Sequence, residues 1–170
     1  MTERWVFGYG SLMWRPGFDF VDRAPAVIHG YHRRLCVYSF VHRGTPERPG
    51  LVLGLDRGGA CRGMAYRVAA GDWEKTLAYL RSREQVTSVY LETVRTVRMG
   101  ARPIEALIYL VDRSHRQYAG KLPPAELERL VRQGKGASGP CIDYVRNTLA
   151  HLRGAGVHDP HLEDLMGRLG

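Results

Sequence analysis

The residue of this chain best suited to acid–base chemistry is Glu84, which continues an apolar series at helical spacing. Trp73, Leu77 and Leu80 lie at i, i+4 and i+7 of a predicted helix, and Glu84 follows at i+11. At about 100° per residue these positions fall within roughly 60° of arc, so a carboxyl group is expected at the C-terminal end of a buried face. Burial and the helix dipole there predict a raised pKa, which suits a general acid or base. The alternative is a helix that ends earlier and leaves Glu84 in water.

A second stretch could hold a ligand through its main chain. In Val6-Phe7-Gly8-Tyr9-Gly10-Ser11-Leu12 an apolar strand leads into a glycine-rich turn. Gly8 and Gly10 allow a sharp bend and let a ligand approach main-chain N–H groups, which can form an anion-binding nest. Ser11 lacks the G-x-S-x-G elbow of a nucleophile, so we expect it to donate a hydrogen bond or to line the nest. Met13 breaks the G-x-G-x-x-G pattern, which argues against a dinucleotide fold. An ordinary glycine turn is the alternative.

Two further polar residues are weaker candidates for substrate contacts. Arg43 lies in a turn-rich loop over residues 40–50, where a fixed arginine suits a carboxylate, although a solvated charged loop is the default. Tyr144 lies one position off the apolar series of its predicted helix and could present its hydroxyl to a cleft, or be a boundary aromatic. Two H-x-x-H pairs share no helical face and have no third ligand, so no metal site is predicted.

The elements that must position these residues are predicted to be a run of strands, one helix, two more strands and then further helices. We expect the apolar run 5–7 to be a strand, and further strands at 25–39, 51–55, 61–68, 86–97 and 104–111. Asp56 to Gly59 predicts a hairpin between two of them. A helix follows Asp72, and others follow Pro123, the loop 134–140 and Asp159. The strand 104–111 is apolar on both faces and therefore central. This order predicts an α+β fold around a mostly closed sheet, with residues 1–170 as a single domain.

The charge and the cysteines limit the classes of function. The chain of 170 residues has a formal charge of +8. Nucleic-acid binding is disfavoured, because Arg33-Arg34 is the only adjacent basic pair and no nucleic-acid motif accompanies it. A small anionic substrate suits the charge by electrostatic steering. Three separated cysteines without CxxC favour a reducing cytoplasm. We see neither a secretory signal nor an apolar run near the ~20 residues of a membrane span.

Several different short motifs follow one another along the chain in a characteristic order. They are residues 5–12 with Trp14, Arg33-Arg34, residues 42–46 with Pro49-Gly50, residues 63–67, Tyr79-Leu80 with Arg83-Glu84, and Ser138-Gly139 with Tyr144. In this order and spacing they resemble the ChaC-like, glutathione-specific γ-glutamylcyclotransferases, nearly from end to end. The resemblance implies a small mixed β-barrel with flanking helices. It also implies a carbon–nitrogen lyase of the amidine-lyase class, which converts glutathione to 5-oxoproline and Cys-Gly without metal or organic cofactor.

The resemblance also assigns roles to residues. Glu84 would take a proton from the γ-glutamyl α-ammonium and return it to the departing amine. Residues 6–12 would hold the γ-glutamyl group, with Tyr144 at the same end of the substrate and Arg43 as a further contact. Some relatives follow the Arg-Glu pair with Lys and Gly-Gly-Tyr, where this chain has Gln85-Val86-Thr87, and this leaves substrate stringency open. The alternatives are a cyclotransferase for another γ-glutamyl amide and a non-enzymatic basic binding module. The sequence does not define the oligomeric state.

Overall fold

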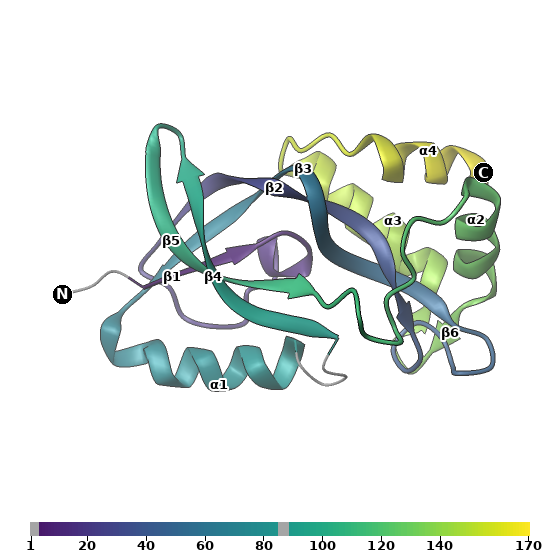
Figure 1. The fold of residues 1–170 in the computed structure, drawn as a ribbon, viewed down its shortest axis with the longest axis horizontal. Helices are drawn as coiled ribbons and strands as arrows, with labels where there is room; N and C mark the ends of the chain where they lie inside the picture. Colours follow the sequence, from purple (N-terminus) through teal and green to yellow (C-terminus); the bar gives the residue numbers. More distant parts are fainter. Residues whose placement is uncertain (1–3, 85–88) are drawn as a thin grey trace. The chain divides into compact units, whose positions relative to one another are not determined.

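The chain folds into two compact units that share two long strands. The computed structural model describes residues 4–84 and 89–170 (Figure 1). One unit consists of Met1–Arg33 with Leu55–Asp112, and the other of Arg34–Gly54 with Arg113–Gly170. Strands β2 (Asp22–Ser39) and β3 (Gly50–Val68) contribute residues to both units. The single-domain organisation expected from the sequence stays a prediction.

The first unit is built on a closed five-stranded barrel with the order β1-β3-β2-β4-β5. β1 (Arg4–Gly8) runs antiparallel to β3 and parallel to β5 (Arg102–Val111), and Trp5 lies opposite Ala106 where the barrel closes. β4 (Tyr90–Met99) pairs antiparallel with β5. β5 lies between β1 and β4, and its side chains are buried on both faces from Ala106 to Val111, which confirms the prediction of a central strand.

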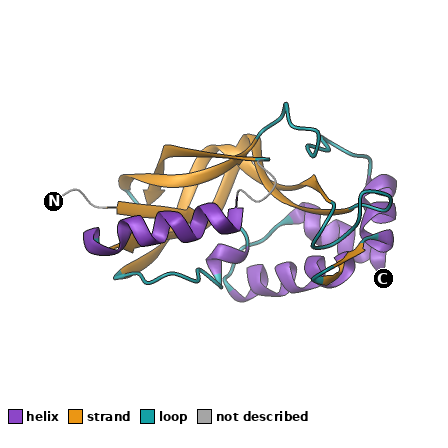
Figure 2. Ribbon diagram, turned by 90° about the horizontal axis from the view of Figure 1, so that it is seen from below, coloured by secondary structure: helices purple, strands orange, loops and turns teal. Residues whose placement is uncertain are grey.

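Helix α1 (Trp73–Glu84) lies along the barrel strands of its own unit (Figure 2). A short 3-10 turn, η2 (Ala70–Asp72), leads into it. Leu80 is completely buried, and Trp73 and Leu77 pack against the same hydrophobic cluster, which confirms the apolar face predicted from their spacing. The buried members of that cluster come from the helix, the barrel and the turn after β1: Val6, Leu12, Val68, Leu80, Leu107 and Tyr109.

The second unit contains the C-terminal helices. These are α2 (Pro124–Gln133), α3 (Cys141–Gly154) and α4 (Pro160–Leu169), which pack against one another. The short strands β6 (Lys135–Gly136) and β7 (Gly139–Pro140) pair with each other within the loop between α2 and α3. Asp159 caps α4, since its Oδ1 accepts a hydrogen bond of 3.1 Å from the Leu162 N–H. The three predicted C-terminal helices are therefore confirmed.

The predicted hairpin over residues 56–59 is wrong. β3 runs without reversal from Gly50 to Val68, although Gly58 and Gly59 have φ values of +104° and +69°. The Gly58 carbonyl oxygen is 2.9 Å from Nδ1 of His32, which lies on β2. Two glycines in a strand can form an irregularity that bends it locally, and the pairing partner decides between a bend and a turn.

The remaining elements agree with the fold class expected from the sequence. A closed barrel with flanking helices is an α+β arrangement, so that prediction is confirmed. The first residues of the predicted strand 86–97 lie outside the described part of the chain. In that part, none of the helices combines the length and apolar character that a membrane span requires.

Candidate active site

Two side chains of the barrel fix the carbonyl groups of the glycine turn. Arg33 on β2 is 6% exposed, and its Nε donates a hydrogen bond of 2.6 Å to the Tyr9 carbonyl. Tyr66 on β3 is completely buried, and its hydroxyl lies 2.7 Å from both the Leu12 and the Met13 carbonyl oxygens. Burial raises the pKa of the Tyr66 hydroxyl, against the opposing charges of Arg23 and Arg83, so the group stays a donor.

The turn itself forms the 3-10 helix η1 (Ser11–Met13). The Gly10 carbonyl accepts from the Met13 N–H at 2.9 Å, and the Ser11 carbonyl accepts from the Arg15 N–H at 2.7 Å. All peptide bonds described here are trans, so each N–H points away from the carbonyl of the residue before it. The N–H groups of Gly10, Ser11 and Leu12 therefore point away from the anchored carbonyls that precede them.

Gly8 is required at the start of this turn by close packing. A Cβ atom at Gly8 would lie 2.7 Å from the Leu12 Cβ and 3.2 Å from the Leu12 carbonyl carbon. Gly8 pairs with Met64 on β3, and the adjacent Gly63 is also restricted, because a Cβ there would lie 2.3 Å from the Gly8 carbonyl oxygen. The glycine turn predicted from the sequence is thus a tightly packed corner, with Val6, Phe7, Tyr9 and Leu12 buried beside it.

Ser11 is exposed and is bound by an arginine from α1. Its Oγ accepts a hydrogen bond of 2.6 Å from Nη2 of Arg83. The other terminal nitrogen of Arg83, Nη1, donates to the Arg15 carbonyl at 2.7 Å and to the Tyr79 hydroxyl at 3.0 Å. Ser11 thus accepts a hydrogen bond here. Since a hydroxyl can accept and donate at once, its expected role as a donor or as a residue that lines the nest stays a prediction.

Helix α1 continues to Glu84, the candidate acid–base residue. The helix therefore does not end before Glu84, as the predicted helical spacing from Trp73 to Glu84 requires. One turn earlier, Leu80 packs in the same cluster as Val6 and Leu12. The structure thus brings the α1 face and the glycine turn into one core. The Glu84 side chain lies outside the described part, and so do Gln85, Val86 and Thr87.

Arg43 and Tyr144 lie together in the second unit. The Arg43 Cζ is 5.6 Å from the centre of the Tyr144 ring, and its Nη1 donates to the Pro140 carbonyl at 3.2 Å. The Tyr144 hydroxyl accepts a hydrogen bond of 3.0 Å from the Leu53 N–H. Both side chains are half-buried. The guanidinium carries five N–H donors in a fixed plane, which suits a carboxylate.

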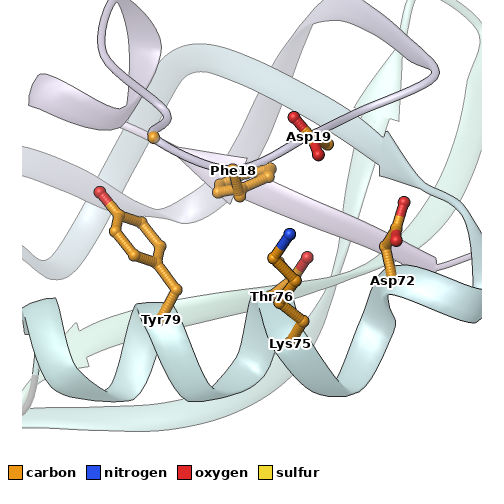
Figure 3. A pocket seen from close by; sticks show the side chains of 7 residues that line it. Phe18, Asp19, Asp72, Lys75, Thr76 and Tyr79 are labelled. Carbon is orange, nitrogen blue, oxygen red and sulfur yellow. The ribbon is translucent and has the colours of Figure 1, made fainter.

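A cavity of about 140 Å³ lies between α1 and the loop that precedes β2 (Figure 3). It is lined by Gly17, Phe18, Asp19, Asp72, Lys75, Thr76 and Tyr79. None of the sequence-predicted site residues is among them. Within the ranges 4–84 and 89–170, no three His, Cys, Asp or Glu side chains gather in a group that could hold a metal ion.

Comparison with known proteins identifies first the fold and then the family of this chain. A crystal structure of a γ-glutamyl cyclotransferase specific to glutathione from yeast has a TM-score of 0.87, at 21% sequence identity, over 99% of this chain and 96% of that one. At this identity the likeness concerns the fold, a small barrel with flanking helices. The family model described as ChaC-like protein matches residues 4–169.

Similar proteins from distant organisms agree with this match. The glutathione-specific γ-glutamylcyclotransferase of Escherichia coli K12 is 32% identical over 95% of this chain and 71% of that protein. The glutathione-specific γ-glutamylcyclotransferase 1 of Danio rerio is 35% identical over 95% and 86%, and that of Homo sapiens is 32% identical over 98% and 78%. The chain belongs to the ChaC-like family, which confirms the resemblance drawn from its motifs.

Sequence reasoning gave no structural role to Arg33, Tyr66 or Arg83, the residues that hold the turn. In the sequence Arg33 belongs to the one adjacent basic pair, but it is buried and donates to main-chain carbonyls. Tyr66 and Arg83 lie in motifs that carried the family resemblance. The available signal was their position: an arginine directly before the candidate base, and an aromatic three residues after Gly63 on an apolar strand.

Proposed function

We propose that this protein cleaves glutathione by cyclising its γ-glutamyl group, which yields 5-oxoproline and Cys-Gly. The α-amine nitrogen forms a bond to the γ-carbonyl carbon of the same residue, and the bond from that carbon to the cysteine nitrogen breaks. Since nucleophile and electrophile belong to one molecule, the protein's task is to fold the substrate into a reactive conformation. The proposal is supported by membership of a family whose relatives carry this activity in their names.

The observation that carries the proposal is the anchoring of the glycine turn. Five successive carbonyls, from Tyr9 to Met13, accept hydrogen bonds from within the fold. The N–H groups of Gly10, Ser11 and Leu12 are thereby oriented away from these bonds before any substrate arrives. Donors that are oriented in advance can stabilise the negative charge that develops on the γ-carbonyl oxygen as the amine attacks. In this proposal Val6, Phe7 and Gly8 are the buried residues that support the turn from below the substrate-binding side.

Glu84 is the proposed general base and acid. An α-ammonium group is not nucleophilic, so a base must first take a proton from it, and the departing amine must then receive one. A single carboxyl group at the end of α1 can serve both steps without any net change in its protonation. Support comes from α1, which is helical as far as Glu84 and packs through Leu80 against Val6 and Leu12.

Arg43 and Tyr144 are proposed as further substrate contacts. Their mutual contact supports this, because a guanidinium held over an aromatic ring has a defined orientation toward a carboxylate ligand. Glutathione carries two carboxylates, which suits a protein with a formal charge of +8. We also propose a cytoplasmic location, which the buried free thiols of Cys36, Cys61 and Cys141 support.

The proposal is tested by direct measurement of products. Purified protein is incubated with glutathione, γ-glutamyl-alanine and γ-glutamyl-ε-lysine, and 5-oxoproline and the released amine are quantified. We expect turnover mainly of glutathione. Preference for another γ-glutamyl compound would reassign the substrate within the same chemistry. Absence of 5-oxoproline from all three would refute the proposed reaction and favour a binding role, which salt-dependent retention on heparin or DNA would then support.

The role of Glu84 is tested with the isosteric variant Glu84→Gln. The amide cannot accept the substrate proton, so we expect at least a 1,000-fold fall in kcat, within the range of general acid–base effects. The thermal midpoint should stay close to that of the parent protein. Near-parental release of Cys-Gly by a folded Glu84→Gln protein would remove Glu84 from the mechanism.

A further inference from the structure

We propose that Arg83 is a positioning residue that fixes the distance between the end of α1 and the glycine turn. This inference rests on the proposed function, in which the helix supplies the base and the turn holds the γ-glutamyl group. It adds a requirement that the proposed function does not contain: these two parts of the first unit must be tied together by a side chain that need not touch the substrate.

The contacts of Arg83 connect the helix to the turn and to the loop after it. Nη2 donates to the Ser11 Oγ at 2.6 Å. Nη1 donates to the Arg15 carbonyl at 2.7 Å and lies 3.3 Å from the Pro16 carbonyl oxygen. These acceptors belong to one continuous segment that begins inside η1. A single guanidinium thus holds the outer side of the turn, while Arg33 and Tyr66 hold its inner side.

Tyr79 keeps the Arg83 side chain in this orientation. Its hydroxyl lies 3.0 Å from the Arg83 Nη1, one helical turn before it on α1. The loop after the turn leaves almost no space here, since a Cβ on Gly17 would lie 2.0 Å from the Tyr79 hydroxyl oxygen. Figure 3 shows the Tyr79 ring extending from α1 toward this loop. Arg83 is therefore bound both by its own helix and by the segment that it holds.

The last turn of α1 is held from a second side by Arg81. Its guanidinium makes two hydrogen bonds of 3.0 Å to the carboxylate of Glu92 on β4. The Tyr109 hydroxyl on β5 donates to the same carboxylate at 2.8 Å. Arg81 thus ties the helix end to the barrel wall, whereas Arg83 ties it to the turn. The two arginines are two residues apart and differ in what they hold, which makes Arg81 a matched control.

A lysine cannot replace Arg83 in this arrangement. An ammonium is a compact charge on a flexible stem, whereas the guanidinium is a planar fork with donors at fixed angles. Holding the Ser11 hydroxyl and the Arg15 carbonyl at once uses two different terminal nitrogens. Lysine would keep the charge and one of these contacts but would lose the fixed separation between helix and turn.

The test compares Arg83→Met, Arg83→Lys and Arg81→Met with the parent protein in glutathione turnover. A misplacement of about 1 Å at a reacting centre costs about 100-fold in rate. We therefore expect Arg83→Met to lower kcat about 100-fold with little change in KM, and Arg83→Lys to recover little of it. The kcat of Arg81→Met should stay within about threefold of the parent value. In the Ser11→Ala background the effect of Arg83→Met should be much smaller, because one acceptor is already absent.

A second readout does not depend on activity. Hydrogen exchange of the Met13, Trp14 and Arg15 amides, which donate to carbonyls of the turn, should become faster in Arg83→Met and stay unchanged in Arg81→Met, while the amides of β5 remain protected in both. Equal losses of kcat in the two Met variants, or parental kcat in a folded Arg83→Met protein, would overturn the inference. If the parent protein does not turn over glutathione, the proposed function fails. Hydrogen exchange then decides by itself whether Arg83 holds the turn.

Discussion

Replacement of Gly8 by alanine tests whether the close packing of the turn is required for the proposed chemistry. The added Cβ would lie 2.7 Å from the Leu12 Cβ and 3.3 Å from the Met13 nitrogen. Carbon atoms normally pack about 3.5–4.0 Å apart, so the two Cβ atoms must separate by about 1 Å. A Cβ atom cannot rotate away, because it is bonded directly to the main chain. The backbone of the turn must therefore move.

Two magnitudes follow from this displacement. Overpacking in a well-filled interior costs about 1–3 kcal/mol, which for a protein of this size lowers the thermal midpoint by roughly 2–12 °C. A shift of about 1 Å in the donors that we propose to face the γ-carbonyl group would lower the rate by about 100-fold. We therefore expect Gly8→Ala to be folded at 25 °C but to lose most of its activity on glutathione.

The assay combines a thermal melt with initial rates of 5-oxoproline formation. Gly71→Ala is the control, since a Cβ there meets no atom within 4 Å and Gly71 has no positive φ. We expect this control to melt within about 2 °C of the parent, as exposed substitutions usually do, and to keep its rate. If Gly8→Ala retained parental activity and midpoint, the turn would tolerate displacement, and the argument from preoriented N–H groups would be refuted.

Two further predictions concern the other proposed contacts and the helix end. Tyr144→Phe removes a hydroxyl from the proposed binding set and should raise the KM for glutathione about three- to tenfold, the size of one hydrogen bond; an unchanged KM in initial-rate measurements would exclude Tyr144 from that set. Hydrogen bonds from Arg81 hold the pKa of the Glu92 carboxyl below its usual value. This ion pair therefore stabilises the fold above the unfolded-state pKa of about 4.3 and less so as pH falls through the lower folded value. At pH 7 the thermal midpoint of the parent should be higher than that of Glu92→Gln, and the difference should disappear in acid. A difference in midpoint that does not change with pH would contradict this.

The sequence was sufficient to predict most of the fold, because its signals were local and repeated. The apolar spacing of Trp73, Leu77 and Leu80 predicted both α1 and its buried face, and Asp159 before a proline predicted the cap of α4. The hairpin at residues 56–59 failed for a reason that lies elsewhere in the chain. Two glycines permit either a reversal or a local bend, and the choice depends on the pairing with β2 around His32, which a single sequence does not reveal.

The sequence predicted the main-chain turn of the candidate site but not the side chains that hold this turn. Two glycines flanking an aromatic residue suggested a turn that could bind an anion. Which groups hold that turn depends on residues from three other elements: Arg33 on β2, Tyr66 on β3 and Arg83 on α1. Nothing in the spacing of these residues indicates that they converge, because their proximity results from closure of the barrel.

That closure also determines when the turn can form during folding. β1 is the first strand of the chain, but it is completed on one side by β3 and on the other by the parallel pairing of Trp5 with Ala106. A parallel contact between residues so distant in sequence carries a large loop-closure entropy and forms slowly. During synthesis β1 has no partner until β3 has been made, and Tyr66 and Arg83 also follow far behind it. The residues of β1 are therefore synthesised well before the strands that order them, and the turn after β1 is fully held only when the barrel has closed.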